Sequence, residues 1–238
     1  MDKSPTTIDN YYLEHHYIHK SNWLRAAVLG ANDGILSTAS IAIGMATATD
    51  MREQILLATL AGLVAGALSM AAGEYVSVSS QTDVEKADIE REKKELEEDP
   101  EFELSLLAKI YEDRGLKKET ALLVAKELTE KDALAAHVRD ELGINELNQA
   151  NPIQAALASG ASFTVGGLLP FAVTLFFPLK NIEYSLYGCT LFFLIFLGAL
   201  AAKTGGSSIA KAVLRITFWG TIAMGITAYV GYLFGVHV

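Results

Sequence analysis

Residues 55–98, ILLATLAGLVAGALSMAAGEYVSVSSQTDVEKADIEREKKELEE, join an apolar stretch to a highly charged one. Residues 55–80 contain a single charged side chain, Glu74, and exceed the roughly 20 residues that a helix needs to cross the hydrocarbon of a bilayer. No glycine or proline interrupts residues 75–98, and Gln81 to Glu98 is rich in helix-forming side chains. The stretch therefore predicts a membrane-spanning helix that continues into water.

Four further stretches are long and apolar enough to span a bilayer. They are residues 23–48, 153–177, 184–202 and 213–236. Backbone groups in lipid must be hydrogen-bonded within the structure, and the ten-residue alternation of a membrane barrel is absent from the sequence. The sequence predicts an all-α integral membrane protein with five transmembrane helices.

The net charge of −9 is concentrated in one insert. Residues 81–150 hold 20 acidic and 11 basic side chains, whereas the rest of the chain holds 8 of each. Nucleic acid is excluded as a partner because its phosphates require stripes of Lys and Arg. The single cysteine, Cys189, rules out an intrachain disulfide framework, and the polar residues 1–20 do not resemble a cleavable signal peptide.

Basic residues near the ends of the spans predict the orientation. Lys20 and Arg25 precede the first span, and three more basic residues join the fourth and fifth. These ends should be cytosolic. We therefore expect a cytosolic N-terminal segment (1–22), transmembrane helices 1 and 2 (23–80), an acidic cytosolic helical domain (81–150) and transmembrane helices 3 to 5 (151–238).

The first span carries a carboxylate, Asp33, about ten residues from its start. A charge at that depth costs about 2.5–3.5 kcal/mol even on the lenient insertion scale, so we expect it to face a partner or water. At helical spacing Asp33, Ser37, Ser40 and Gly44 share one face, as in a helix that lines a pore.

The second span has its own stripe, formed by Gly62, Gly66, Met70 and Glu74. A carboxylate suits Fe²⁺ and Mn²⁺, and a thioether one helical turn away favours transition metals. Met70 could instead only fill a gap in the core, and Glu74 could only emerge into interfacial water.

The acidic insert is expected to form a small helical bundle. Asp99 and Pro100 are typical of an N-cap and first turn, and Arg114-Gly115 should close that helix. Two more helices are expected over 117–130 and 131–142, with Gly143 as the stop.

Several insert carboxylates have spacings that suit a metal. Glu92 and Glu95 share a helical face, and His137 and Glu141 are one turn apart. We hypothesise that Glu92, Glu95, Glu103 and Glu141 converge on cations, although most charge runs are simply solvated faces. His15, His16 and His19 could also bind metal or lie in a plain interfacial segment.

Residues 29–35 (LGANDGI) and 66–75 (GALSMAAGEY) closely resemble the vacuolar iron transporter family. The resemblance extends over nearly the whole chain. It implies a homodimer that moves Fe²⁺ or Mn²⁺ out of the cytosol in exchange for protons, along a path between paired first and second helices. It further implies that Asp33 and Met70 line the path, and that the glutamates of the insert bind metal.

Carried over by position, the insert glutamates of the family match Glu92, Glu95, Glu103 and Glu141. The chain departs from the family pattern in three places. It has Gly62 and Leu106 where the family has glutamates, and His137 with Val138 where the family has a methionine pair.

We therefore expect a proton-coupled transporter whose metal-binding residues are Asp33, Met70, Glu74, Glu92, Glu95, Glu103, His137 and Glu141. It should lie in the cell membrane of a prokaryote or in a vacuolar-type membrane of a eukaryote. The metal ions are cargo, and no cofactor is expected. The alternative is a membrane-anchored metal sensor or store. An enzyme is disfavoured, because the sequence lacks both a nucleophile–base pair and the paired Glu-x-x-His motifs of ferritin-like oxidases.

Overall fold

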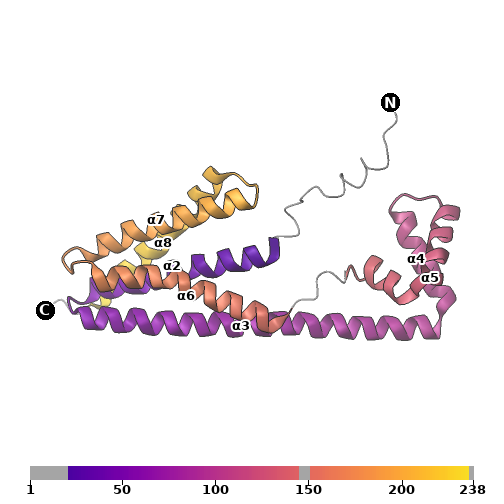
Figure 1. Ribbon diagram of the computed structural model, residues 1–238, viewed down its shortest axis with the longest axis horizontal. Coiled ribbons are helices and arrows are strands. Elements are labelled where there is room, and N and C mark those ends of the chain that lie inside the picture. Colours follow the sequence, from indigo (N-terminus) through magenta and orange to yellow (C-terminus); the bar gives the residue numbers. More distant parts are fainter. Residues whose placement is uncertain (1–20, 145–150, 236–238) are drawn as a thin grey trace, which may run out of the picture. The chain divides into compact units, whose positions relative to one another are not determined.

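The computed structural model describes residues 21–144 and 151–235, and every regular element in these ranges is a helix. The helices are α2 (Ser21–Ala48), α3 (Arg52–Glu98), α4 (Pro100–Asp113), α5 (Lys118–Asp140), α6 (Pro152–Phe176), α7 (Ile182–Thr204) and α8 (Ile209–Phe234), shown in Figure 1.

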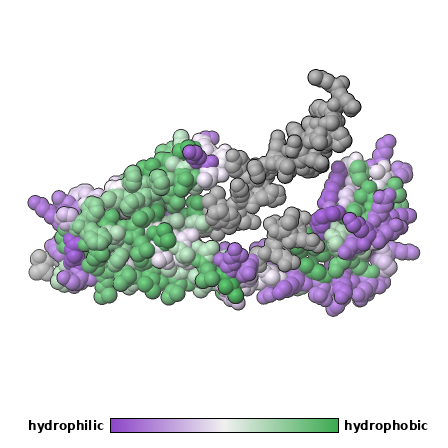
Figure 2. Space-filling view, in the orientation of Figure 1, coloured by the Kyte–Doolittle hydropathy of each residue, from purple (hydrophilic) through white to green (hydrophobic). Residues whose placement is uncertain are grey.

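Five of these helices are long and apolar enough to cross a membrane, namely α2, α3, α6, α7 and α8. Large hydrophobic side chains on them are exposed, among them Leu57, Phe192 and Phe234. A water-soluble protein rarely leaves so much apolar surface uncovered. The predicted all-α fold with five spans is confirmed. Figure 2 shows hydrophobic residues over the surface of the apolar parts of these helices, and mainly hydrophilic residues around α4, α5 and the carboxyl-terminal part of α3.

The chain forms two compact units. The apolar unit contains α2, α6, α7, α8 and the part of α3 up to Glu74. The acidic unit begins at Tyr75 within α3, contains α4 and α5, and ends at Pro152.

In the apolar unit, α2 approaches its neighbours through glycines. A Cβ atom at Gly34 would overlap the carbonyl of Phe163 in α6, and one at Gly231 in α8 would overlap the carbonyl of Gly44. Such close backbone approach is how membrane helices gain packing energy where lipid offers no hydrophobic drive. The other sides of α2 meet a core with α7 and α8 that includes Ala39, Leu186 and Met224.

Arg52, the first residue of α3, binds the carboxyl end of α6. Its guanidinium donates hydrogen bonds to the carbonyls of Thr174 (2.7 Å), Leu175 (3.0 Å) and Phe177 (2.6 Å). The last carbonyls of a helix have no intrahelical partner, and a charged donor satisfies them better than a neutral one. Arg52 therefore fastens the start of α3 to the end of α6.

The acidic unit folds largely as its local signals predict. The side chain of Asp99 accepts a hydrogen bond from the Phe102 amide (3.1 Å) and caps α4, and Gly115 ends it with φ +99°. The break expected at residues 130–131 occurs at Asp132, where φ and ψ leave the helical region inside α5. Its carboxylate accepts a hydrogen bond from the Ala135 amide, so Asp132 caps the second segment of α5.

Arg52→Ala should destabilise the apolar unit by about 2 kcal/mol or more, because it removes charge-assisted hydrogen bonds from three carbonyls. The melting temperature in detergent should fall by several degrees. Arg215→Ala is the matched control, since Arg215 is exposed on α8 and makes no hydrogen bond or ion pair with the described residues. Equal melting temperatures for the two variants would contradict this role of Arg52.

Candidate functional site

Three elements of the acidic unit bring four potential metal ligands together. Glu92 comes from α3, Glu103 from α4, and His137 and Glu141 from the end of α5. Glu103 is accessible to solvent over only 6% of its surface and Glu92 over 3%, whereas His137 is fully buried. Behind them lies a small core of Leu107, Ala108, Ala125 and Ala136. The cap at Asp99 reverses the chain after α3, and this reversal lets Glu103 face Glu92.

One ring nitrogen faces all three carboxylates. His137 Nδ1 lies 2.8 Å from an oxygen of Glu92, 3.0 Å from one of Glu141 and 3.8 Å from one of Glu103. The four ligand atoms all lie within 4.8 Å of one another. Nδ1 can donate at most one proton, and its hydrogen-bonding partner is Glu141, so the buried Glu92 Oε1 has no hydrogen bond among the described residues. The cluster thus has more acceptors than donors.

The electrostatics of the cluster favour a bound cation. Burial raises the pKa of Glu103; His137 opposes this rise, and the charge of Glu141 adds to it. A divalent ion would relieve both the loss of hydration and the repulsion between carboxylates. Three carboxylates and an imidazole fit a transition metal such as Fe²⁺ or Mn²⁺.

Glu95 is not part of this group. It is exposed on α3, and its charge adds to the rise in the pKa of Glu103 from outside the cluster. Its role as a ligand remains a prediction, and His15, His16 and His19 lie outside the described residues.

In the apolar unit, Asp33 and Met70 line one groove of about 360 Å³. Asp33 and Ser37 come from α2, and Gly66 and Met70 from α3. The Ser37 hydroxyl donates to the main-chain carbonyl of Asp33 (2.7 Å), which leaves the Asp33 carboxylate available. The groove therefore joins part of each polar stripe expected from the sequence.

Only the first half of the polar stripe expected on α2 lines the groove. Ile41 lines the groove, whereas Ser40 is buried and Gly44 packs against Thr227 of α8. At this level α2 already contacts α8, and the helix face that carries Asp33 no longer opens into the groove. Glu74 is half-buried and lies outside the groove lining.

Phe163 of α6 also lines the groove, and the sequence analysis did not identify it. Its ring lies over Gly66, where a Cβ atom would overlap the ring. A Cβ atom at Gly62 would likewise meet the end of the Ile41 side chain. The glycines of α3 could have suggested a bulky neighbour, but an aromatic residue within an apolar span carries no signal of its own.

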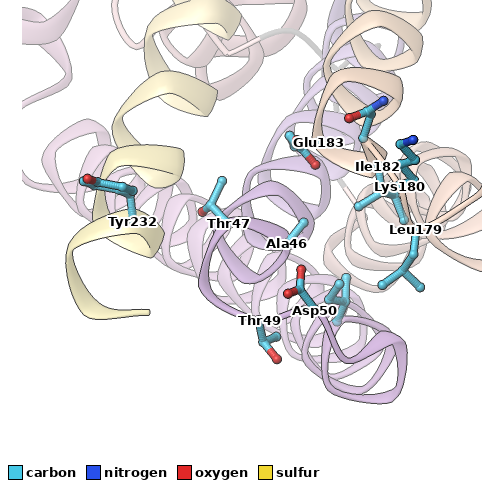
Figure 3. Close-up of a pocket in the computed structure, with 11 residues that line it drawn as sticks. Ala46, Thr47, Thr49, Asp50, Leu179, Lys180, Ile182, Glu183 and Tyr232 are labelled. Atoms are coloured by element: carbon cyan, nitrogen blue, oxygen red, sulfur yellow. The ribbon is translucent and has the colours of Figure 1, made fainter. Parts of the chain in front are cut away.

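A second cavity of the apolar unit, of about 340 Å³, contains none of the predicted ligands (Figure 3). It lies where α2, α7 and α8 come together, and Asp50, Lys180 and Glu183 line it. A cation there would meet the ammonium group of Lys180 as well as two carboxylates. The groove at Asp33 is therefore the better candidate for a cation path.

Comparison with known proteins identifies the family of the chain. Residues 24–232 match the VIT family. The chain is 45% identical to the vacuolar iron transporter of Acanthamoeba castellanii, over 90% of this chain and 82% of that protein. It is 34% identical to vacuolar iron transporter homolog 1 of Oryza sativa subsp. japonica, over 93% of this chain and 78% of that protein. The match covers all five apolar helices and the acidic unit, and this chain is therefore a multi-pass membrane protein that belongs to the VIT family.

Proposed function

We propose that this chain transports Fe²⁺ or Mn²⁺ out of the cytosol in exchange for protons. The observation that carries the proposal is the groove in which Asp33 of one span and Met70 of the next meet. A carboxylate alone would accept many cations, whereas a thioether beside it favours transition metals. The names of the relatives point to iron.

In this proposal Asp33 binds a metal ion and a proton in turn. Its carboxylate binds the metal on the cytosolic side, releases it on the other side and returns protonated. A carboxylate at membrane depth is costly when it stands alone, which favours its occupation by a cation or a proton at every stage. Met70 contributes selectivity and does not titrate.

A second copy of the chain would complete the path. The groove is open, and Asp33 is exposed on the surface of the single chain. On α3, Leu57 and Leu68 are also largely exposed. Pairing two copies through α2 and α3 would enclose the groove and shield Asp33 from lipid, in keeping with a homodimer.

The acidic unit would collect metal on the cytosolic side. The buried Glu92, Glu103 and His137 and the exposed Glu141 provide the ligands, and the net negative charge around them raises the local concentration of cations. In a eukaryote the membrane would be vacuolar, as the names of the relatives suggest, and in a prokaryote the cell membrane.

The alternative function is a membrane-anchored metal sensor or store. The cluster in the acidic unit would serve that role equally well. Asp33 favours transport, because a simple anchor gains nothing from a carboxylate within a span.

Asp33→Asn should abolish Fe²⁺ and Mn²⁺ flux into proteoliposomes, because the amide can neither bind a divalent ion well nor exchange a proton. Flux would be measured with a metal-quenched dye, and an imposed proton gradient should stimulate it in the wild type. Asp50→Asn, which changes a carboxylate in the other cavity, should retain at least half of the flux. Wild-type flux in Asp33→Asn would overturn the mechanism, and metal binding without flux in the wild type would favour the sensor or store.

Glu103→Gln and His137→Ala should each lower Mn²⁺ affinity of the full chain by about 10-fold or more, because each removes a buried ligand. Titrations would use an Asp33→Asn and Met70→Ala background, so that only the acidic unit contributes. Glu101→Gln, an exposed carboxylate two residues from Glu103, is the control. The same titration of Glu95→Gln decides whether this exposed residue is a ligand, and unchanged affinity in Glu103→Gln would remove the cluster from the proposal.

A further inference from the structure

Next to the proposed metal cluster, a network of hydrogen bonds joins α4 to α5. At its centre is Asp140, whose side chain is only 8% exposed. Its carboxylate accepts hydrogen bonds from the Tyr111 hydroxyl (2.8 Å), from Arg114 (2.7 Å) and from its neighbour Arg139 (2.7 Å). Burial opposes ionisation, but the hydrogen bonds from Arg139, Arg114 and Tyr111 lower the pKa of Asp140 to about 2. These three donors stabilise the ionised carboxylate of Asp140.

Arg114 holds the backbone of α5 as well as the side chain. A second nitrogen of its guanidinium donates to the carbonyl oxygen of Asp140 (3.2 Å), one of the last carbonyls of the helix. The guanidinium carbon lies 5.2 Å from the centre of the Tyr111 ring. Two bonds from one rigid group fix both the position and the rotation of the last turn of α5.

That turn carries two of the metal ligands. Glu141 follows Asp140 directly, and His137 precedes it by three residues. On α4, Glu103, Leu107 and Tyr111 recur every four residues along one face, so the cluster and the network lie on the same α4–α5 interface with the buried Leu107 between them. The network therefore sets where His137 and Glu141 stand relative to Glu103.

We infer that Tyr111, Arg114 and Asp140 are positioning residues for the metal cluster, and that their network determines how well the cluster discriminates between ions of different size. The inference rests on the proposed metal site. A rigid set of ligands favours an ion that fits its spacing, whereas a loosened set also accommodates a larger ion such as Ca²⁺. Loss of the network should thus weaken Mn²⁺ binding more than Ca²⁺ binding.

The test is a titration of the full chain with Mn²⁺ and with Ca²⁺, in the Asp33→Asn and Met70→Ala background. Asp140→Asn should lower Mn²⁺ affinity by about 10- to 100-fold, the usual effect of losing a group that orients a ligand, and should reduce the preference for Mn²⁺ over Ca²⁺. Tyr111→Phe removes one hydrogen bond and should give a smaller change in the same direction. Asp113→Asn is the control, because Asp113 is exposed on α4 and pairs only with Lys109 among the described residues.

Each result is decisive. Mn²⁺ affinity of Asp140→Asn within twofold of Asp113→Asn would overturn the inference, and so would equal losses for Mn²⁺ and Ca²⁺, which would indicate a role in folding alone. If Asp140→Asn does not fold, the same comparison of Mn²⁺ and Ca²⁺ affinities in Tyr111→Phe and Arg114→Gln tests the inference. Failure of the metal site itself is recognised separately, because Glu103→Gln would then leave Mn²⁺ binding intact.

Discussion

The approach of α2 to the backbones of its neighbours is the constraint on which the apolar unit depends. In lipid, apolar side chains gain nothing by leaving the solvent, so helices are held together by close packing and by hydrogen bonds. Gly34 lies against the Phe163 carbonyl, and Gly231 lies against that of Gly44. These contacts leave α2 no freedom to rotate. Asp33 consequently faces the groove that α2 forms with α3, and does not face the interior of the bundle.

The acidic unit differs from the apolar unit because it buries ionisable side chains. Next to its small apolar core it buries Glu92, Glu103 and His137. Buried carboxylates that repel one another reduce stability unless a cation or a hydrogen-bond donor compensates them. The network at Asp140 is a nearby contrast, because two arginines and a tyrosine satisfy its single carboxylate. The Asp140 carboxylate is satisfied within the chain, whereas the proposed metal cluster would be satisfied by a bound ion.

Local signals made much of this architecture predictable. The spans follow from length and hydropathy, and the Asp99 cap follows from a residue type whose side chain competes for amide protons. The hypothesis from the sequence brought Glu92, Glu95, Glu103 and Glu141 together and paired His137 with Glu141 only. It did not tell Glu92 and Glu95 apart. They are three residues apart on α3, and an offset of roughly 60° around the helix turns one inward and the other toward water.

Contacts between residues far apart in the sequence were not predicted. Arg52 binds carbonyls more than 120 residues away, Phe163 reaches the groove from α6, and Asp140 meets Tyr111 across 29 residues. No periodicity or local motif encodes these pairings, because each depends on how helices pack after they form. The same is true of Ser40 and Gly44, whose helix face is shared between the groove and α8.

Two of the three breaks between helical segments of the acidic unit have an aspartate as the cap of the next segment, and each of these two is followed closely by a proposed ligand. Glu103 comes four residues after Asp99, and His137 comes five residues after Asp132. Each residue inserted between an aspartate and its ligand would turn that ligand by about 100° away from the cluster. An insertion in the turn over residues 115–117 would not change the number of residues between an aspartate cap and its ligand. Length variation during evolution should therefore accumulate in that turn, while the two short intervals after Asp99 and Asp132 keep their number of residues.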